Sequence, residues 1–193
     1  MSQSAALSRP ALADALRRSD APLAVQVAGV VGFAALAALG AHARIYLWEV
    51  PITLQTVAVY GAGLFLGGRN GFLAMALYLT AGLVLPVFAG GASGLGYFAS
   101  SASAGYLLAY PLVALLIGRW TDDRPTFLRS ALAMTAGAAL LFTVGVAWLH
   151  VAAGHATWWE SVVKGCLLFI GWDLAKVWLV AGGYAGLRRA AGA

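Results

Sequence analysis

The chain has 193 residues, of which 62% are hydrophobic and only 10% are charged, with a formal net charge of +5 and a mean hydropathy of +0.84. Soluble domains contain about 45–50% apolar and about 25% charged residues, so this composition excludes an ordinary soluble protein and indicates an integral membrane protein. The single cysteine excludes an internal disulfide and a cysteine-based metal cluster.

Six apolar segments follow one another along the chain, most of them long enough to cross a bilayer as a helix. They run over residues 22–41, 51–66, 72–87, 103–117, 128–149 and 161–184. The second opens on Pro51, and proline is well placed in the first turn of a helix. The sequence therefore predicts an all-α integral membrane protein with one transmembrane domain over residues 1–193. It comprises an N-terminal segment over 1–20 and a six-helix bundle over 22–186.

Basic residues are concentrated on one side of the predicted bundle. With six spans both termini lie on the same side, which holds Arg9, Arg17, Arg18, Arg69, Arg119, Arg124, Arg129, Arg188 and Arg189. The opposite side holds Arg44 and Lys164. Because cytoplasmic loops carry the excess of lysine and arginine, we expect both termini and segment 1–20 to be cytoplasmic. Topology thus explains the positive net charge, and no nucleic-acid partner is expected.

The first two segments contain small and polar residues that could pack helices together or line a cavity. Ala34 and Ala38 lie four positions apart, which allows close packing of the first helix on another helix, within the chain or on a partner. Thr53 and Gln55 are polar groups near the outer end of the second segment. They either line a cavity or bond neighbouring helices. Glycine and asparagine in residues 67–71 supply the left-handed backbone of a tight inner turn.

The outer loop over residues 88–101 is rich in glycine and serine and has no charged residue. Such a segment can fold over a cavity as a lid and offer backbone groups for hydrogen bonding. It can equally be a flexible connector, and the composition leaves both interpretations open.

The sixth segment contains Asp173 and Lys176 near its centre. A charge at mid-membrane costs about 2.5–3.5 kcal/mol on insertion scales, so such residues face protein, a polar cavity or a ligand. Residues three positions apart share one helix face, and Phe169 and Trp172 flank the pair on that face. An aromatic surface with polar groups suits a small, mostly apolar ligand with a polar end. A packing ion pair and a proton relay are the alternatives.

Several sequence motifs of enzymes are missing from the chain. There is no G-x-x-x-x-G-K-[ST] phosphate loop, no G-x-S-x-G and no H-E-x-x-H. His42, His150 and His155 do not have the spacing of metal ligands. We therefore expect neither an enzyme nor a bound metal or cofactor.

Four runs of residues together resemble the BioY family, the biotin-specific substrate-capture (S) components of energy-coupling-factor (ECF) transporters. They are V-P-I-T-L-Q-T at 50–56, L-P-V-F-A-G-G at 85–91, G-Y-L-L at 105–108 and D-x-x-K at 173–176. The resemblance covers roughly residues 34–176, and the first two runs together are the most specific part of it.

This resemblance implies a six-helix S-component fold with a biotin pocket near the outer face. The family's late aspartate and lysine contact the ligand head and correspond to Asp173 and Lys176, and the glycine-rich loop over 88–101 closes over the ligand. The candidate ligand-binding residues are Asp173, Lys176, Trp172, Phe169, Phe88, Gly90, Gly91, Ser93, Tyr106, Thr53 and Gln55.

The resemblance also implies partners. The small-residue stripe with Ala34 and Ala38 is expected to dock on a transmembrane coupling (T) subunit, which pairs with two ATPase subunits. The expected function is high-affinity biotin binding in an ECF-type uptake transporter of the bacterial plasma (inner) membrane, with biotin as the transported ligand and lipid as the surroundings. A self-sufficient biotin carrier and an S component for a different vitamin are the alternatives.

Overall fold

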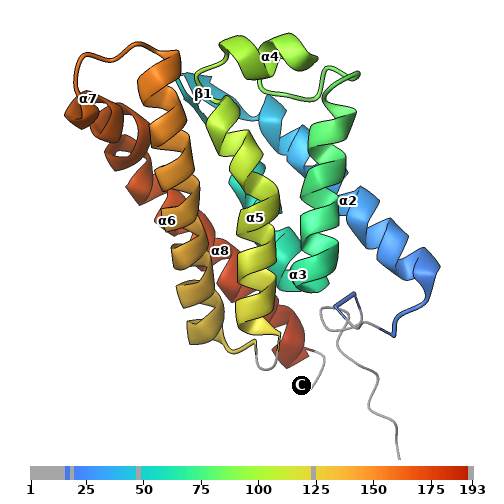
Figure 1. Ribbon diagram of the computed structural model, residues 1–193. Helices are drawn as coiled ribbons and strands as arrows, with labels where there is room; N and C mark the ends of the chain where they lie inside the picture. Colours follow the sequence, from blue (N-terminus) through green and yellow to red (C-terminus); the bar gives the residue numbers. More distant parts are fainter. Residues whose placement is uncertain (1–15, 18–19, 47–48, 123–124, 191–193) are drawn as a thin grey trace, which may run out of the picture.

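The computed structural model describes residues 16–17, 20–46, 49–122 and 125–190, so most of the predicted segment 1–20 lies outside the described residues. Its long helices run side by side from one end of the molecule to the other (Figure 1). They are α2 (Leu23–His42), α3 (Gln55–Ala81), α5 (Ala104–Thr121), α6 (Phe127–Ala152) and α8 (Leu168–Ala190). Within the described part, four stretches are long and apolar enough to cross a membrane: α2, α5, α6 and the continuous run Trp158–Ala190. The mostly helical fold is as predicted.

Helix α3 doubles back on itself at Gly67. This residue has a φ of 75° and a ψ of 178°, a conformation that suits glycine because it has no Cβ. A Cβ added at Gly71 would lie 3.0 Å from the carbonyl oxygen of Ala62, so the halves over residues 55–66 and 68–81 pack against each other in antiparallel fashion. The predicted inner turn over 67–71 is thus shorter than expected, because the helix resumes directly after Gly67.

A short β-hairpin precedes α3 and corrects one prediction. Strand β1 (Arg44–Tyr46) pairs in antiparallel fashion with β2 (Pro51–Thr53), and the helix begins at Gln55 rather than at Pro51. The residue before a proline favours extended backbone, and β-branched Ile52 and Thr53 continue that conformation. The prediction of a helix starting at Pro51 was therefore wrong by four residues.

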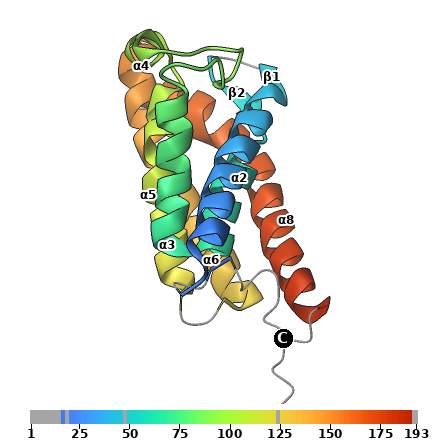
Figure 2. The ribbon, with the colours of Figure 1, turned by 90° about the vertical axis from the view of Figure 1, so that its right-hand side faces the viewer.

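The outer loop after α3 lies over the same end of the molecule as the β-hairpin (Figure 2). It contains a bridge between Phe88 and Ala92 and then helix α4 (Leu95–Ser100). The Phe88 ring is fully buried against the rings of Tyr78, Tyr97 and Phe98, at centroid distances of 5.6, 4.8 and 5.4 Å. This apolar anchor fastens the loop to the bundle, which argues against a purely flexible connector.

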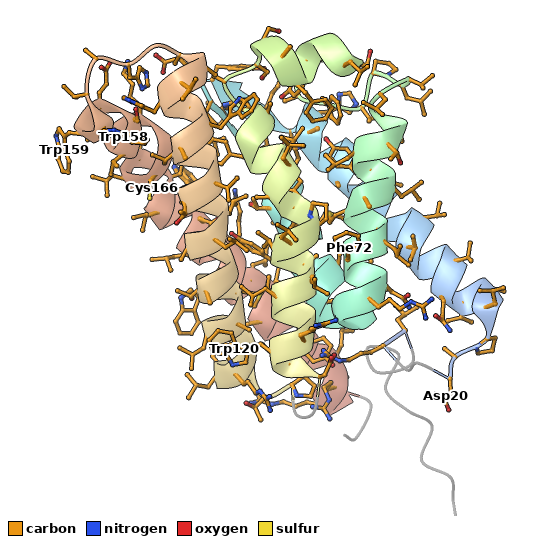
Figure 3. The ribbon with its side chains drawn as sticks, viewed as in Figure 1. Asp20, Phe72, Trp120, Trp158, Trp159 and Cys166 are labelled. Atoms are coloured by element: carbon orange, nitrogen blue, oxygen red, sulfur yellow. The ribbon has the colours of Figure 1, made fainter. Side chains whose placement is uncertain are left out.

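The last membrane segment changes its helical geometry along its length. Helix α7 (Trp158–Val162) leads into a π-helical turn η1 (Val163–Leu167) and then into α8. Within the π-turn, the carbonyl oxygen of Gly165 accepts a hydrogen bond from the Tyr106 hydroxyl at 2.7 Å. Trp158 and Trp159 lie near one end of the molecule and Trp120 near the other (Figure 3). Exposed tryptophans at both ends are typical of the two membrane interfaces.

Charged side chains gather at the two ends of the bundle. At the end where α2 begins, Arg17 bonds the carbonyl oxygen of Leu64 at 2.7 Å and pairs with Asp122 at 3.0 Å. At the opposite end, the Lys164 ammonium lies 3.0 Å from Glu49 and 2.9 Å from Glu160. The apolar helices between these ends are what a membrane-embedded protein requires.

Candidate ligand-binding site

A narrow cavity lies inside the bundle, beneath the outer loop. Residues of β2, α3, α5, α6, α8 and the outer loop line this cavity, which has a volume of about 50 Å³. The lining includes six of the predicted ligand-binding residues: Thr53, Gln55, Tyr106, Phe169, Asp173 and Lys176. A bicyclic ligand would have to push this lining outward.

Asp173 is buried on α8 and is held from the facing helix. Its side chain is 4% exposed, and its Oδ2 accepts a hydrogen bond of 2.6 Å from the hydroxyl of fully buried Tyr60. Thr56 lines the cavity beside the same carboxylate. Thr56 and Tyr60 lie four positions apart in α3, so both face α8. The neutral Tyr60 hydroxyl therefore holds one oxygen of the carboxylate in place.

Lys176 reaches the same threonine from one turn further along α8. Its Nζ donates to Thr56 Oγ1 at 2.9 Å, on the same helix that holds Asp173 through Tyr60. An ammonium group has three N–H donors, and Lys176 makes no second hydrogen bond to the residues that the structure describes. The carboxylate and the ammonium thus have different protein partners, Tyr60 and Thr56, while both border the cavity. A packing ion pair would more typically close on itself.

Gln55 serves the fold as well as the cavity wall. Its Oε1 accepts a hydrogen bond of 2.9 Å from the Thr53 hydroxyl, and its Nε2 donates to the Tyr78 hydroxyl at 2.6 Å. Tyr78 in turn donates to the carbonyl oxygen of Val87 at 3.1 Å. This chain of bonds ties β2, both halves of α3 and the outer loop together. Both interpretations of these polar residues, lining a cavity and bonding neighbours, therefore apply.

Trp172 does not lie where the sequence placed it. Its side chain is 58% exposed and does not line the cavity. Successive residues of a helix are rotated by about 100°, so turning Asp173 inward carries the adjacent Trp172 to the flank of α8. Phe142 of α6 lines the cavity instead and supplies an aromatic wall beside Phe169.

The predicted ligand-binding residues of the outer loop also lie away from the cavity. Phe88, Gly90, Gly91 and Ser93 do not line the cavity, whereas Ala89 and Tyr97 do. Gly90 and Gly91 have φ angles of 87° and 73°, so they form the turn between the bridged residues. Phe88 lies behind the lining and anchors the loop. The loop thus contributes to the cavity wall, but through neighbours of the predicted residues.

The predicted docking residues of α2 are largely covered by the chain itself. Ala34 is only 8% exposed within the core, and Ala38 is half-buried against that core. The stripe thus packs mainly within the chain, which is one of the two roles that its spacing allowed, and docking of a partner on it stays a prediction. Small residues at four-residue spacing do remain exposed on the opposite face of α2, at Ala24, Ala28 and Gly32.

Sequence reasoning missed several residues that build the site. Tyr60 lies one turn after Thr56 in α3, so helical spacing alone could have placed it on the same face. Tyr97, Tyr110 and Phe142 come to the cavity from α4, α5 and α6, which lie far apart in the sequence. They carry no local motif, and only tertiary packing brings them together.

Comparison with known proteins identifies the family. A model of the BioY family matches residues 11–193. The probable biotin transporter BioY of Lysinibacillus sphaericus is 44% identical over 123 residues, which are 62% of this chain and 62% of that protein. The probable biotin transporter BioY of Pyrococcus horikoshii is 31% identical over 154 residues, covering 79% and 90% of the two chains.

A solved structure shares the fold. The crystal structure at 2.1 Å of the S-component for biotin from an ECF-type ABC transporter matches with a TM-score of 0.76 and 24% identity. The match covers 85% of this chain and 90% of that chain. With a family match over almost its whole length, the chain belongs to the BioY family.

Proposed function

We propose that the chain captures biotin in this cavity, as the S component of an ECF-type transporter. Its family comprises transport proteins rather than enzymes, and the relatives described above are named biotin transporters. The observation that carries the proposal is the arrangement of Asp173 and Lys176, which border one cavity and are held by Tyr60 and Thr56 of the facing helix.

The chemistry of the cavity suits the head of biotin. The ureido ring has two N–H donors and one carbonyl acceptor, Asp173 supplies a charged acceptor, and Lys176 supplies charged donors. Phe169 and Phe142 provide aromatic walls for the fused rings. Leaving buried polar groups unmatched costs free energy, so the site discriminates against ligands without the ureido atoms.

The helices suggest how the chain sits in the membrane. We propose six crossings, with the two halves of α3 counted separately because they run antiparallel on either side of Gly67. The end that holds Arg17 and Arg188 would face the cytoplasm, following the positive-inside rule. The cavity would then open toward the outer face of a bacterial plasma membrane.

Energy for uptake would come from partner subunits. We propose that a transmembrane coupling subunit, paired with ATPases, docks on the exposed face of α2 that contains Ala24, Ala28 and Gly32. Small residues let two helices approach closely in lipid, and a Cβ added at Gly32 would meet no atom within 4 Å. This face is less covered by the chain itself than the stripe of Ala34 and Ala38.

Isothermal titration calorimetry of the detergent-purified chain tests the proposed ligand. Biotin should bind tightly, desthiobiotin, which keeps the ureido ring, should bind as well, and thiamine and riboflavin should not. Binding of another vitamin in preference to biotin would refute the assignment. Uptake by liposomes that contain this chain alone would instead show a self-sufficient carrier.

A further inference from the structure

One more polar group borders the cavity, the hydroxyl of Tyr110 on α5. Tyr110 is 3% exposed, yet its hydroxyl makes no hydrogen bond to any residue that the structure describes. Three other buried tyrosines do have partners: Tyr60 bonds Asp173, Tyr78 bonds Val87 and Tyr106 bonds Gly165. Buried polar groups are nearly always paired, so an unpaired one calls for an explanation.

The Tyr110 hydroxyl is not sealed inside the protein. Among the described residues, Ser130 Oγ is the side-chain polar atom that is both fully enclosed and without a hydrogen-bond partner. The Tyr110 hydroxyl also has no partner, but it is not fully enclosed. It therefore keeps access to space, and the adjoining space is the cavity that Tyr110 lines. A phenylalanine would fill the same volume without the cost of an unpaired hydroxyl.

The neighbours of Tyr110 place it between the charged pair and the outer loop. Its ring stacks on that of Tyr78 with centroids 6.5 Å apart and an interplanar angle of 26°. Tyr78 is itself held by Gln55, so the Tyr110 ring rests on a fixed partner. Asp173 of α8 and Tyr97 of the outer loop are both close enough to act on Tyr110 electrostatically.

We propose that Tyr110 is a ligand-contacting and specificity-determining residue, whose hydroxyl donates a hydrogen bond to an acceptor oxygen on the head of the bound ligand. The inference rests on the proposed function and names a third polar contact within the same site. A carbonyl oxygen has two lone pairs, so it can accept from Lys176 and from Tyr110 together. The ligand class is a neutral heterocycle that has a carbonyl group beside its N–H donors.

Tyr110→Phe tests this assignment because it should move two observables in opposite directions. Biotin affinity should fall about tenfold, near the upper end of what a hydrogen bond from a neutral group contributes. The melting temperature of the ligand-free protein should stay unchanged or rise, because an unpaired buried hydroxyl is removed. Tyr46→Phe, which removes an exposed hydroxyl from β1, is the matched control and should change neither quantity.

Three results would overturn the inference. If wild type binds biotin and Tyr110→Phe binds it equally well, Tyr110 makes no ligand contact, while the proposed function stands. If affinity and ligand-free stability fall together, the hydroxyl has a structural role. If wild type itself does not bind biotin, the proposed function fails, and the inference fails with it.

Discussion

Replacing Asp173 by asparagine should separate ligand recognition from packing. Asparagine has nearly the same volume and keeps an oxygen that can accept the 2.6 Å hydrogen bond from Tyr60, but it removes the negative charge. Hydrogen bonds to charged groups contribute about 1.5–3 kcal/mol. Since about 1.4 kcal/mol corresponds to a factor of ten, we expect the dissociation constant for biotin to rise about 10- to 150-fold.

The same substitution leaves Lys176 without its counter-charge. Removing one member of a buried pair is destabilising because it leaves a charge uncompensated. Lys176 is only half-buried, so the protein should still fold but melt at a lower temperature. Lys176→Met should weaken biotin binding by at least tenfold for the complementary reason. The double variant Asp173→Asn with Lys176→Met is neutral, so it should recover thermal stability without recovering affinity.

Calorimetry and thermal unfolding of wild type, the two single variants and the double variant show whether Asp173 and Lys176 bind the ligand or only pack the helices. Unchanged affinity in both single variants would return the pair to a packing role. Affinity that recovers along with stability in the double variant would show that the charges act through the protein structure rather than on the ligand. Either result would refute the recognition scheme.

Three further predictions follow from side-chain placement. Trp172→Ala should leave the biotin dissociation constant within about twofold of wild type, because the ring faces away from the cavity. Gly32→Leu should impair uptake by cells that express the partner subunits while sparing biotin binding, because it adds bulk only to the exposed face of α2. A hydrogen bond from its own backbone and one from Lys164 hold the pKa of Glu49 below its usual value. A carboxyl group whose pKa is lower in the folded chain than in the unfolded chain stabilises the fold above the unfolded pKa of about 4.3. This contribution is lost as the pH falls below that value, so the melting temperature of Glu49→Gln should depend less on pH over that range than the melting temperature of wild type.

Each of these predictions has a contradicting outcome. A tenfold loss of affinity in Trp172→Ala would mean that α8 rotates when the ligand binds. Normal uptake by Gly32→Leu would move the docking surface away from this face of α2. Melting curves of wild type and Glu49→Gln that decline in parallel between about pH 6 and about pH 3 would show that the Glu49 contact contributes nothing to stability.

Long apolar runs made the helices predictable from the sequence. A helix must satisfy its own backbone in lipid, so uninterrupted apolar residues leave few alternatives. The inward orientation of Asp173 was predictable for the same reason, because a charge cannot face hydrocarbon. The strand at Pro51–Thr53 was missed because it depends on pairing with β1. Proline is compatible with both structures, and the sequence pattern alone did not distinguish them.

The finer parts of the site depend on rotation of helices about their axes. Trp172 and Asp173 are adjacent, so a helical wheel drawn without knowledge of which side of α8 is buried can place both residues on the inward face. In the structure the buried face of α8 contains Phe169, Asp173 and Val177, which excludes Trp172. Tyr110 could not be singled out in advance, because an unpaired hydroxyl becomes visible only when all neighbouring partners are in place.

A crystal structure of the chain with biotin would show directly which residues contact the ligand. We predict that the ureido group lies in the cavity between α3, α5, α6 and α8. One of its N–H groups should be within hydrogen-bonding distance of the Asp173 carboxylate, and its carbonyl oxygen should face Lys176. A complex in which these two side chains point away from biotin, or in which biotin lies outside this cavity, would refute the proposed recognition of biotin by Asp173 and Lys176.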